Sequence, residues 1–581
     1  MDMMSRIASL AADALKHTWP EAQGLPEAEE IRGLLAVPPD PSLGDYALPV
    51  FRLAKALRMA PPKIAQAVAE GWQHVDVARV EAVNGYLNFF LNRVRFAEET
   101  VEAVLRAGEK YGASDMGVGK TVCLDYSSIN IAKRFHIGHL STTMIGHSLK
   151  RIYDHLGYTT VGINHLGDWG TQFGKMIYAY KTWGSKEEVE KGGVNELVRL
   201  YVKFHEEAEK DKSLEDEGRA WFKKIEDGDE EARAIWNWFK ELTLRDTARV
   251  YDLLGVSFDS YAGESFYNDK MDRVIDTLRE KNLLTVSDGA SVVDLKEVDE
   301  EGKETKNSMP PCIILRSDGA TLYATRDLAA ALYRQETYHF DKCLYVVAYQ
   351  QDLHFRQLFR VLEKMGYPWA KDCVHVAFGM ISYEGQSLST RKGYVVYLEE
   401  LLEQAQQKAL AIINEKSPDL PNKEEVARQV GIGAVVYADL SNNRIKDIDF
   451  HWDRALNFDG ETGPYVQYTH ARCCSVLRKA ADAALPTPDW RGLEDDEAQA
   501  CLRLIGRFPD VICEAAEKYE PSMITRAVTD IAQAYNKFYY EHRILDEVPG
   551  VSAARVALTK AVRQVIKTGL YLIGIEAPER M

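Results

Sequence analysis

Four short apolar runs along the chain each stop at a group of polar residues or at a glycine. They cover residues 122–124, 161–163, 344–347 and 374–378, and stop at Asp125, Asn164, Gln350 and Gly379. Apolar runs of this length, separated by helical patterns, predict the strands of a parallel α/β sheet. Ligands bind such sheets at the carboxyl ends of the strands, so we expect one site assembled from several loops.

The remaining patterns divide the chain into parts. Helical spacing, a break at Pro38–Pro39 and an apolar run at 86–91 predict a small α+β domain over residues 1–112. Glu and Lys at helical spacing over about 183–320 predict a helical insertion. Beyond Tyr397, residues 398–415, 424–437 and most of 463–573 predict helices. We therefore expect a sheet domain over 113–405, a helical connector over 406–455 and an all-α domain over 456–581.

The composition limits the class of protein. No apolar run approaches the roughly 18 residues of a membrane span, and the start of the chain lacks the apolar block of a secretory signal. We therefore expect a cytoplasmic protein without membrane contact. The eight cysteines include no CxxC pair, and the adjacent Cys473 and Cys474 fall in a helical pattern, where packing is their ordinary role. Neither disulfides nor a structural metal is expected.

The net charge of −17 argues against a nucleic-acid partner, but binding depends on local fields rather than on the sum of charges. Near the C-terminus, Lys560, Arg563 and Lys567 fall at i, i+3 and i+7, on one face of a helix. This stripe fits either a solvated surface or a nucleic-acid contact.

The sharpest local feature is His136-Ile137-Gly138-His139, at the start of a helical pattern. A helix N-terminus offers free N–H groups to a phosphate, and imidazoles can donate hydrogen bonds to phosphoryl oxygens as charge builds there. Gly138 leaves room for a ligand. A metal-binding pair, or two histidines satisfied in the core, fits the same spacing.

A second feature is Ser389-Thr390-Arg391-Lys392, on a loop after the fourth run. Hydroxyls and cations ahead of a glycine suit a loop that closes over a polyphosphate, although an ordinary basic surface loop fits as well. The chain has no GxxxxGK[ST] and no GxGxxG pattern, so the common phosphate-binding loops are absent.

Together the two features resemble the class I aminoacyl-tRNA synthetases, in which a H-I-G-H helix start and a K-M-S-K-type loop bracket ATP on a Rossmann-type sheet. Within that class the chain resembles arginyl-tRNA synthetase. The motifs that carry the resemblance lie at residues 44–47, 88–91, 125–133, 164–174, 323–327, 351–354, 462–472 and 576–581. Two positions depart from the pattern. Arg134 stands where the family usually has proline. It either adds to the positive charge, disturbs the turn, or is an exposed side chain. Ser387 stands where the loop would have its first lysine, a role that Lys133 would take over.

The resemblance implies an α/β class I catalytic domain with a helical insertion, between a small α+β domain that binds the tRNA elbow and an all-α anticodon-binding domain. It implies ligation of L-arginine to tRNA(Arg) through arginyl-adenylate, with ATP and Mg²⁺, after tRNA has bound. We take a monomer as the default. The residues it assigns to phosphate stabilisation and loop closure are His136, His139, Lys133, Ser389, Thr390, Arg391 and Lys392. Those assigned to ATP binding are Gly138, His139, Gly379, Met380 and Ile381. Those assigned to arginine are Asp125, Asn130, Tyr323, Asp327 and Gln351. Those assigned to tRNA are Asn88, Phe89, Tyr465, Arg472, Lys560, Arg563 and Lys567.

Physical chemistry agrees with arginine as the substrate. A guanidinium is a planar five-donor fork that carboxylates receive best, and a buried carboxylate left unpaired by citrulline would discriminate steeply. A helix cap for Asp327 and core packing for Tyr323 are the plainer alternatives. Two rival functions remain. One is a synthetase-like paralogue that binds tRNA without catalysis, and the other is a ligase of the same superfamily acting on a small amine.

Overall fold

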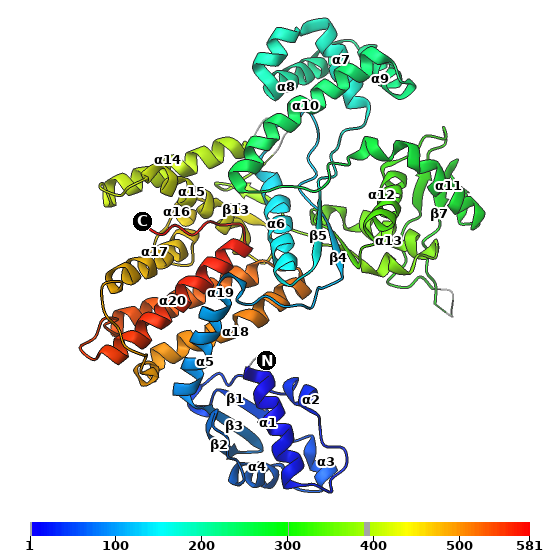
Figure 1. Ribbon diagram of the computed structural model, residues 1–581. Coiled ribbons are helices and arrows are strands. Elements are labelled where there is room, and N and C mark those ends of the chain that lie inside the picture. Colours follow the sequence, from blue (N-terminus) through cyan, green and yellow to red (C-terminus); the bar gives the residue numbers. More distant parts are fainter. Residues whose placement is uncertain (1–2, 300, 302, 389–394) are drawn as a thin grey trace.

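The computed structural model describes residues 3–299, 301, 303–388 and 395–581. Its N-terminal part is a three-stranded antiparallel sheet in the order β1-β3-β2, packed against helices (Figure 1). The strands and helices of this part are α1 (Met3–Thr18), α2 (Ala28–Arg32), β1 (Tyr46–Pro49), α3 (Leu53–Leu57), α4 (Pro61–Glu70), β2 (Val77–Val83) and β3 (Tyr86–Leu91). The apolar side chains of β3, the middle strand, form the core with those of α1 and α4.

The central sheet is parallel, with four strands in the order β10-β9-β4-β5. The strands are β4 (Thr121–Asp125), β5 (Thr159–Ile163), β9 (Lys342–Tyr345) and β10 (Cys373–His375), so each predicted run forms one of them. The chain enters at β4, moves outward to β5 and returns to β9 on the other side of β4. Ligands bind parallel sheets at such a reversal of strand order, beyond the carboxyl ends of the strands.

Helix α6 (Leu140–His155) joins β4 to β5 and packs against the C-terminal helices as well as against the sheet. Leu140, Met144, Leu149 and Ile152 are fully buried. The polar residues Thr143 and Ser148 are fully buried too, so this helix is covered on all sides over residues 140–149. Two further helices flank the inner strand β9 along the chain, α12 (Tyr323–Tyr338) before it and α13 (Asp352–Lys364) between β9 and β10.

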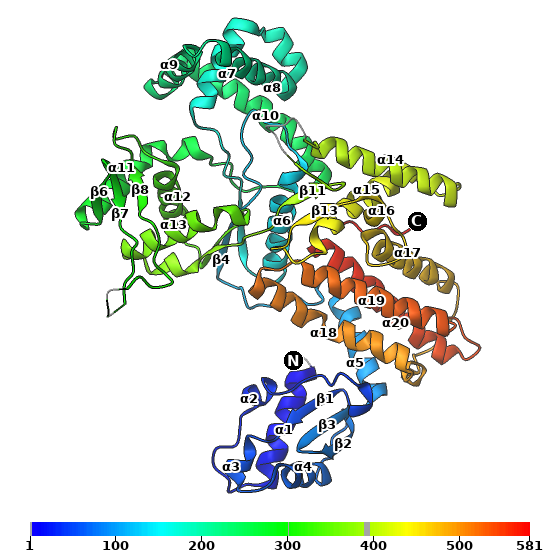
Figure 2. The ribbon, with the colours of Figure 1, turned by 180° about the vertical axis from the view of Figure 1, so that it is seen from behind.

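The insertion differs from its all-helical prediction. Helices α7 (Thr171–Trp183), α8 (Lys186–Lys210), α9 (Leu214–Asp227) and α10 (Glu230–Leu254) form one helical group, and Figure 1 and Figure 2 both show it at one end of the molecule. After α11 (Met271–Glu280), however, the strands β6 (Leu284–Ser287), β7 (Ala290–Val293) and β8 (Cys312–Leu315) form an antiparallel sheet. The strands were missed because the charged residues around them dominate the local pattern.

The C-terminal half is helical as predicted. It consists of α14 (Leu398–Lys416), α15 (Lys423–Leu440), α16 (Trp452–Ala455), α17 (Gly463–Ala480), α18 (Asp496–Lys518), α19 (Ser522–Glu541) and α20 (Pro549–Leu572). The expected domain boundary at 405–406 falls inside α14. The connector also contributes β13 (Ile448–Phe450), which pairs with β11 (Ile381–Tyr383), and β11 pairs in turn with β12 (Gln386–Ser387).

The N-terminal domain is joined to the C-terminal helices rather than to the sheet. Helix α5 (Arg93–Ala107) leaves that domain and packs on α18 and α20. Asp45 accepts a hydrogen bond from the Leu91 main chain at 2.9 Å and forms an ion pair with Arg503 on α18 at 2.8 Å. Across the described residues, no helix is long and apolar enough to cross a membrane.

Candidate active site

The carboxyl edge of the sheet gathers the predicted polar clusters. Asp125 ends β4, and His165 lies two residues beyond β5. The short helix η5 (Tyr349–Gln351) follows β9, and an isolated parallel bridge between Ala348 and Phe378 extends the β9–β10 pairing toward Gly379. The side chains of these four loops therefore share one edge, as the sequence pattern predicts.

His136 and His139 form a reciprocal cap at the start of α6. The Nδ1 atom of His136 accepts a hydrogen bond from the Gly138 N–H at 3.1 Å, and the Nδ1 atom of His139 accepts one from the His136 N–H at 3.2 Å. A main-chain N–H can only donate, so each neutral ring carries its proton on Nε2. The two ring centroids lie 3.9 Å apart.

Burial keeps both rings neutral. It lowers the pKa of His136 to about 4, and the positive charge of the nearby, exposed Lys133 acts in the same direction. Burial, and then the neighbouring His136, lower the pKa of His139 to about 3. At neutral pH the pair therefore offers two Nε2–H donors beside a lysine cation, an arrangement suited to phosphoryl oxygens.

The chain on both sides of the Ser389–Lys392 sequence contacts this cap. Leu388 lies on one side, and its Cδ1 would be 3.9 Å from a Cβ added at Gly138. On the other side, the Ile137 N–H donates to the Val396 oxygen at 2.9 Å, and the Leu398 N–H donates to the Phe135 oxygen at 3.0 Å. The chain that flanks the second feature on either side therefore lies next to the histidine cap. Ser389, Thr390, Arg391 and Lys392 themselves lie outside the described residues.

Arg134 is neither fully exposed nor free. Its side chain is 18% exposed and forms an ion pair with Glu400 at 2.8 Å, and its guanidinium carbon lies 3.4 Å from the ring centroid of Tyr397. The alternative of an exposed side chain is therefore wrong. Arg134 ties the turn before His136 to the first turn of α14.

Asp125, assigned to arginine binding, is already paired within the chain. Its Oδ2 accepts from the buried Arg334 at 2.7 Å, and its Oδ1 accepts from the Ser128 hydroxyl at 2.7 Å. Arg334 is 1% exposed, and the charge of Asp125 raises its pKa against the effect of burial. The carboxylate therefore neutralises a guanidinium that belongs to the protein.

Asp327 is the other carboxylate at this edge. It lies one turn after Tyr323 on α12, and its Oδ2 is 2.7 Å from Nε2 of His354. Its Oδ1 is 3.8 Å from Nε2 of His165. Burial would raise the pKa of Asp327, but the hydrogen bond and charge of His354 outweigh it and lower that pKa. Tyr323 is 58% exposed, with its ring 4.9 Å from that of His354, so core packing does not explain it.

Sequence reasoning missed several members of this network. Arg334 stands in an apolar stretch of α12, which was the only available signal for a buried pair. His165 and His354 belong to recognised motifs but had no role assigned. Glu264, at the start of η4 (Glu264–Lys270), was hidden in the insertion, and burial raises its pKa to about 7.

Two residues assigned to adenosine already use their main-chain N–H groups in hydrogen bonds within the chain. The Gly379 N–H donates to the Arg444 oxygen at 2.8 Å, and the Met380 N–H donates to Oδ1 of Asp447 at 2.7 Å. Ile381 is buried, whereas the Met380 side chain is 40% exposed. Asn130 and Gln351, from the arginine set, are both exposed at the carboxyl edge.

Two of the tRNA assignments are corrected by the structure. Asn88 is 4% exposed and Phe89 is fully buried, and because successive side chains of a strand point to opposite faces, both faces of β3 are covered at this point. Neither side chain can contact a partner. The exposed aromatic residues of this domain are Phe51 and Tyr86, whose rings lie 5.2 Å apart.

The other tRNA assignments fall on α17 and α20. The Asn536 side chain donates to the Tyr465 hydroxyl at 2.9 Å and accepts from Arg472 at 2.5 Å. Exposed tyrosines at 468, 539 and 540 surround this group.

The basic stripe on α20 is only partly available for contact. Lys560 is exposed, Arg563 is half-buried, and Lys567 forms an ion pair with Glu109 at 2.9 Å.

A possible metal site lies away from this edge. Within the described ranges, one group of His, Asp and Glu side chains has atoms close enough to hold an ion, namely Asp495, Glu497 and His542 near the start of α18. His542 already lies 3.2 Å from Asp495.

Comparison with known proteins covers all three parts of the fold. A model described as the arginyl tRNA synthetase N terminal domain matches residues 5–91, one for the catalytic domain of tRNA synthetases class I (R) matches 100–452, and one for the DALR anticodon binding domain matches 466–581. The arginine–tRNA ligase of Alkaliphilus metalliredigens is 54% identical over 553 residues, which cover 95% of this chain and 96% of that protein. That of Clostridioides difficile is 53% identical over 554 residues, with 95% and 96% covered. The solved Thermus thermophilus arginyl-tRNA synthetase superposes with a TM-score of 0.82 at 26% identity over 100% of both chains.

Proposed function

The chain belongs to the class I arginyl-tRNA synthetase family and is an arginine–tRNA ligase that uses ATP, L-arginine and tRNA(Arg), and from that premise we propose which side chains carry each step. In the first step the carboxylate of arginine attacks the α-phosphate of ATP and releases pyrophosphate. In the second, a terminal ribose hydroxyl of the tRNA takes the arginyl group and releases AMP. The protein chiefly positions the reactants and stabilises developing charge.

His136 and His139 donate to the phosphate oxygens through Nε2–H, and Lys133 supplies the positive charge. The observation that carries this assignment is the reciprocal cap, because it fixes both rings as Nε2–H donors at a helix N-terminus. The Ser389–Lys392 sequence closes over pyrophosphate. This is supported by the contacts of Leu388 and Val396 with the cap. Mg²⁺ enters with ATP, whose phosphate charge it neutralises.

Asp327 receives the guanidinium of the substrate, and Tyr323 lies over it. Support comes from the position of this carboxylate at the carboxyl edge and from its ionised state, which His354 and His165 maintain. Asp125 acts as a positioning residue instead, because Arg334 and Ser128 occupy its oxygens. Adenosine lies along the loop at Gly379, between β10 and β11, against the exposed side chain of Met380.

The tRNA extends from this site over the C-terminal helices. Tyr465 and Arg472 with the surrounding tyrosines offer stacking surfaces for unpaired bases. In the N-terminal domain, Phe51 and Tyr86 take the place of the two buried residues as candidates for contact.

The direct test is ATP–pyrophosphate exchange with each of the twenty amino acids, with and without tRNA. We expect exchange with arginine alone, and only when tRNA is present. Exchange without tRNA would contradict the required order of binding. Exchange with no amino acid, despite measurable tRNA binding, would favour the non-catalytic paralogue. Exchange with a carboxylic acid that is not an amino acid, followed by transfer of its acyl group from the adenylate to a small amine with release of AMP, would favour the other rival.

A further inference from the structure

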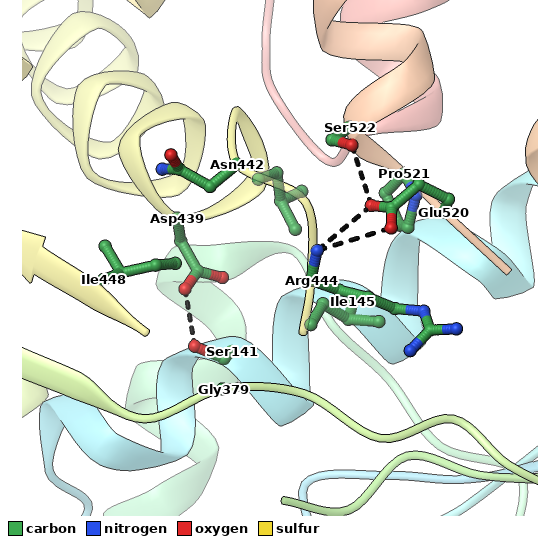
Figure 3. Close-up of a pocket in the computed structure, with 11 residues that line it drawn as sticks. Ser141, Ile145, Gly379, Asp439, Asn442, Arg444, Ile448, Glu520, Pro521 and Ser522 are labelled. Carbon is green, nitrogen blue, oxygen red and sulfur yellow. Dashed lines mark hydrogen bonds between the residues drawn. The ribbon is translucent and has the colours of Figure 1, made fainter. Parts of the chain in front are cut away.

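Arg444 lies where three parts of the molecule meet, in the segment between α15 and β13. Figure 3 shows this segment between α6, the loop at Gly379 that joins β10 to β11, and the turn from α18 to α19. The main-chain oxygen of Arg444 accepts from the Gly379 N–H at 2.8 Å. Its own N–H donates to the Glu520 carboxylate at 3.3 and 3.4 Å. The main-chain groups of Arg444 therefore connect the loop at Gly379 to the anticodon-binding domain.

The side chain of Arg444 repeats this connection. Its Nε donates to the main-chain oxygen of Tyr519 at 2.9 Å, and one terminal nitrogen donates to that of Ala377 at 2.5 Å. Tyr519 ends α18, whereas Ala377 lies just beyond β10. A guanidinium can hold two acceptors in fixed directions at once, which a lysine ammonium on a flexible stem cannot reproduce.

Close packing at this junction leaves little room for the loop at Gly379 to move independently of the Arg444 segment. A Cβ on Gly379 would lie 2.2 Å from the Lys446 oxygen, and the Met380 N–H is held by Asp447. The cavity at the junction has a volume of only about 10 Å³. Closely packed interiors transmit displacement rather than absorb it. A shift of the Tyr519–Glu520 turn would therefore move the loop at Gly379.

A second contact leads from the same junction to the catalytic helix. Asp439 on α15 accepts from the Ser141 hydroxyl at 2.5 Å (Figure 3), and Ser141 lies two residues after His139. Asp439 is 4% exposed, and its other oxygen has no hydrogen-bond partner. The junction therefore touches both the phosphate side and the adenosine side of the site.

We propose that Arg444 is a positioning residue that couples tRNA binding on the C-terminal helices to nucleotide binding at the loop around Gly379. This inference rests on the proposed placement of adenosine and of tRNA. It assigns the tRNA dependence of activation to a defined pair of contacts, Arg444 with Tyr519–Glu520 and Arg444 with Ala377–Gly379.

The test is a coupling measurement on the full-length protein. The Kd of α,β-methylene-ATP is measured by calorimetry, at saturating L-arginine, with and without an arginine tRNA transcript. Thermodynamic linkage requires that the nucleotide change the Kd of tRNA by the same factor as tRNA changes the Kd of the nucleotide. Measuring both Kd ratios therefore provides an independent check. For the unmodified protein we expect tRNA to tighten nucleotide binding by about fivefold or more.

In Arg444→Lys we expect that ratio to fall below about twofold, while the Kd of nucleotide alone and of tRNA alone each change by less than about twofold. The matched control is Arg151→Lys. Arg151 donates from α6 to the Tyr571 oxygen at 2.7 Å, so it also links the catalytic helix to the C-terminal helices, but it contacts neither Ala377 nor Gly379. It should retain the full ratio. Glu520→Gln, which removes the charge facing Arg444, should lower the ratio and decides the question if Arg444→Lys fails to fold.

An unchanged ratio in the foldable Arg444 or Glu520 variant would overturn the inference. An equal fall of the Kd ratio in Arg151→Lys would also overturn the inference, because that result indicates general loosening of the interface. A ratio of one in the unmodified protein, with normal arginylation, would overturn the coupling and leave the proposed function standing. Absence of arginylation in the unmodified protein would count against the proposed function itself.

Discussion

Replacing His139 with asparagine tests the role assigned to the reciprocal cap. The asparagine oxygen can still accept from the His136 N–H, so the turn is retained, but no donor remains where Nε2–H was. Loss of one donor directed at developing charge costs about 2.7–4 kcal/mol, or roughly 10²- to 10³-fold in rate. The lost contact of the ring with Phe135, whose centroid is 5.1 Å away, affects stability rather than chemistry.

The measurement is single-turnover formation of arginyl-adenylate by rapid quench, with saturating arginine, ATP and tRNA. His147→Asn is the control, because His147 is a buried histidine on the same helix whose ring nitrogens have no hydrogen-bond partner. It should change thermal stability and leave the rate within about threefold, far less than the loss of a charge-stabilising donor. Slowing of His139→Asn by less than threefold, or by no more than His147→Asn, would refute the assignment.

The pH dependence gives a second check on the same reasoning. With pKa values of about 4 and 3, both rings are neutral throughout the range from pH 6 to 8. The adenylation rate should therefore show no limb that belongs to these histidines in that range. A limb near pH 6.5 that disappears in His139→Asn would show that a charged imidazole acts instead.

Three other substitutions test separate parts of the structure. Asp327→Asn should lower kcat/KM for arginine by about 10²-fold or more in aminoacylation assays, because a desolvated guanidinium loses its carboxylate; a loss below tenfold would contradict its role. Burial raises the pKa of Asp439 to about 7, so its ionisation destabilises the folded state increasingly from about pH 4 and fully above about pH 7. Asp439→Asn should therefore raise the midpoint of thermal unfolding relative to the parent at pH 8 and not at pH 4, and the same gain at both pH values would reject the buried charge. Arg563→Gln should weaken tRNA binding and lower the slope of log Kd against log salt by about one unit, whereas an unaltered slope would assign the stripe to a solvated face.

The sheet and its functional edge could be predicted because their signals are local. Each strand is a short apolar run, and each polar cluster directly follows it in the sequence. The histidine cap was predictable for the same reason, since all its hydrogen bonds join residues within three positions of each other.

Contacts between distant residues could not be predicted in this way. Arg334 is conspicuous in an apolar helix, but nothing local tells that its partner is Asp125, 209 residues earlier. Lys567 belongs to the basic stripe by its spacing in the sequence, but the sequence does not show that Glu109 pairs with its charge. Phe89 was assigned to tRNA because a motif match gives no information on which side chains are covered, and Phe89 packs in the core of its domain.

The Asp125–Arg334 pair has a consequence for redesign of the genetic code. The protein already holds a guanidinium of its own against Asp125, one of the acidic groups at the carboxyl edge. Altering substrate choice toward an uncharged arginine analogue would therefore require a change at Asp327 and not at Asp125. A library that varies Asp327 and Tyr323 while leaving Asp125 and Arg334 intact would search a small space without creating an unpaired buried ion.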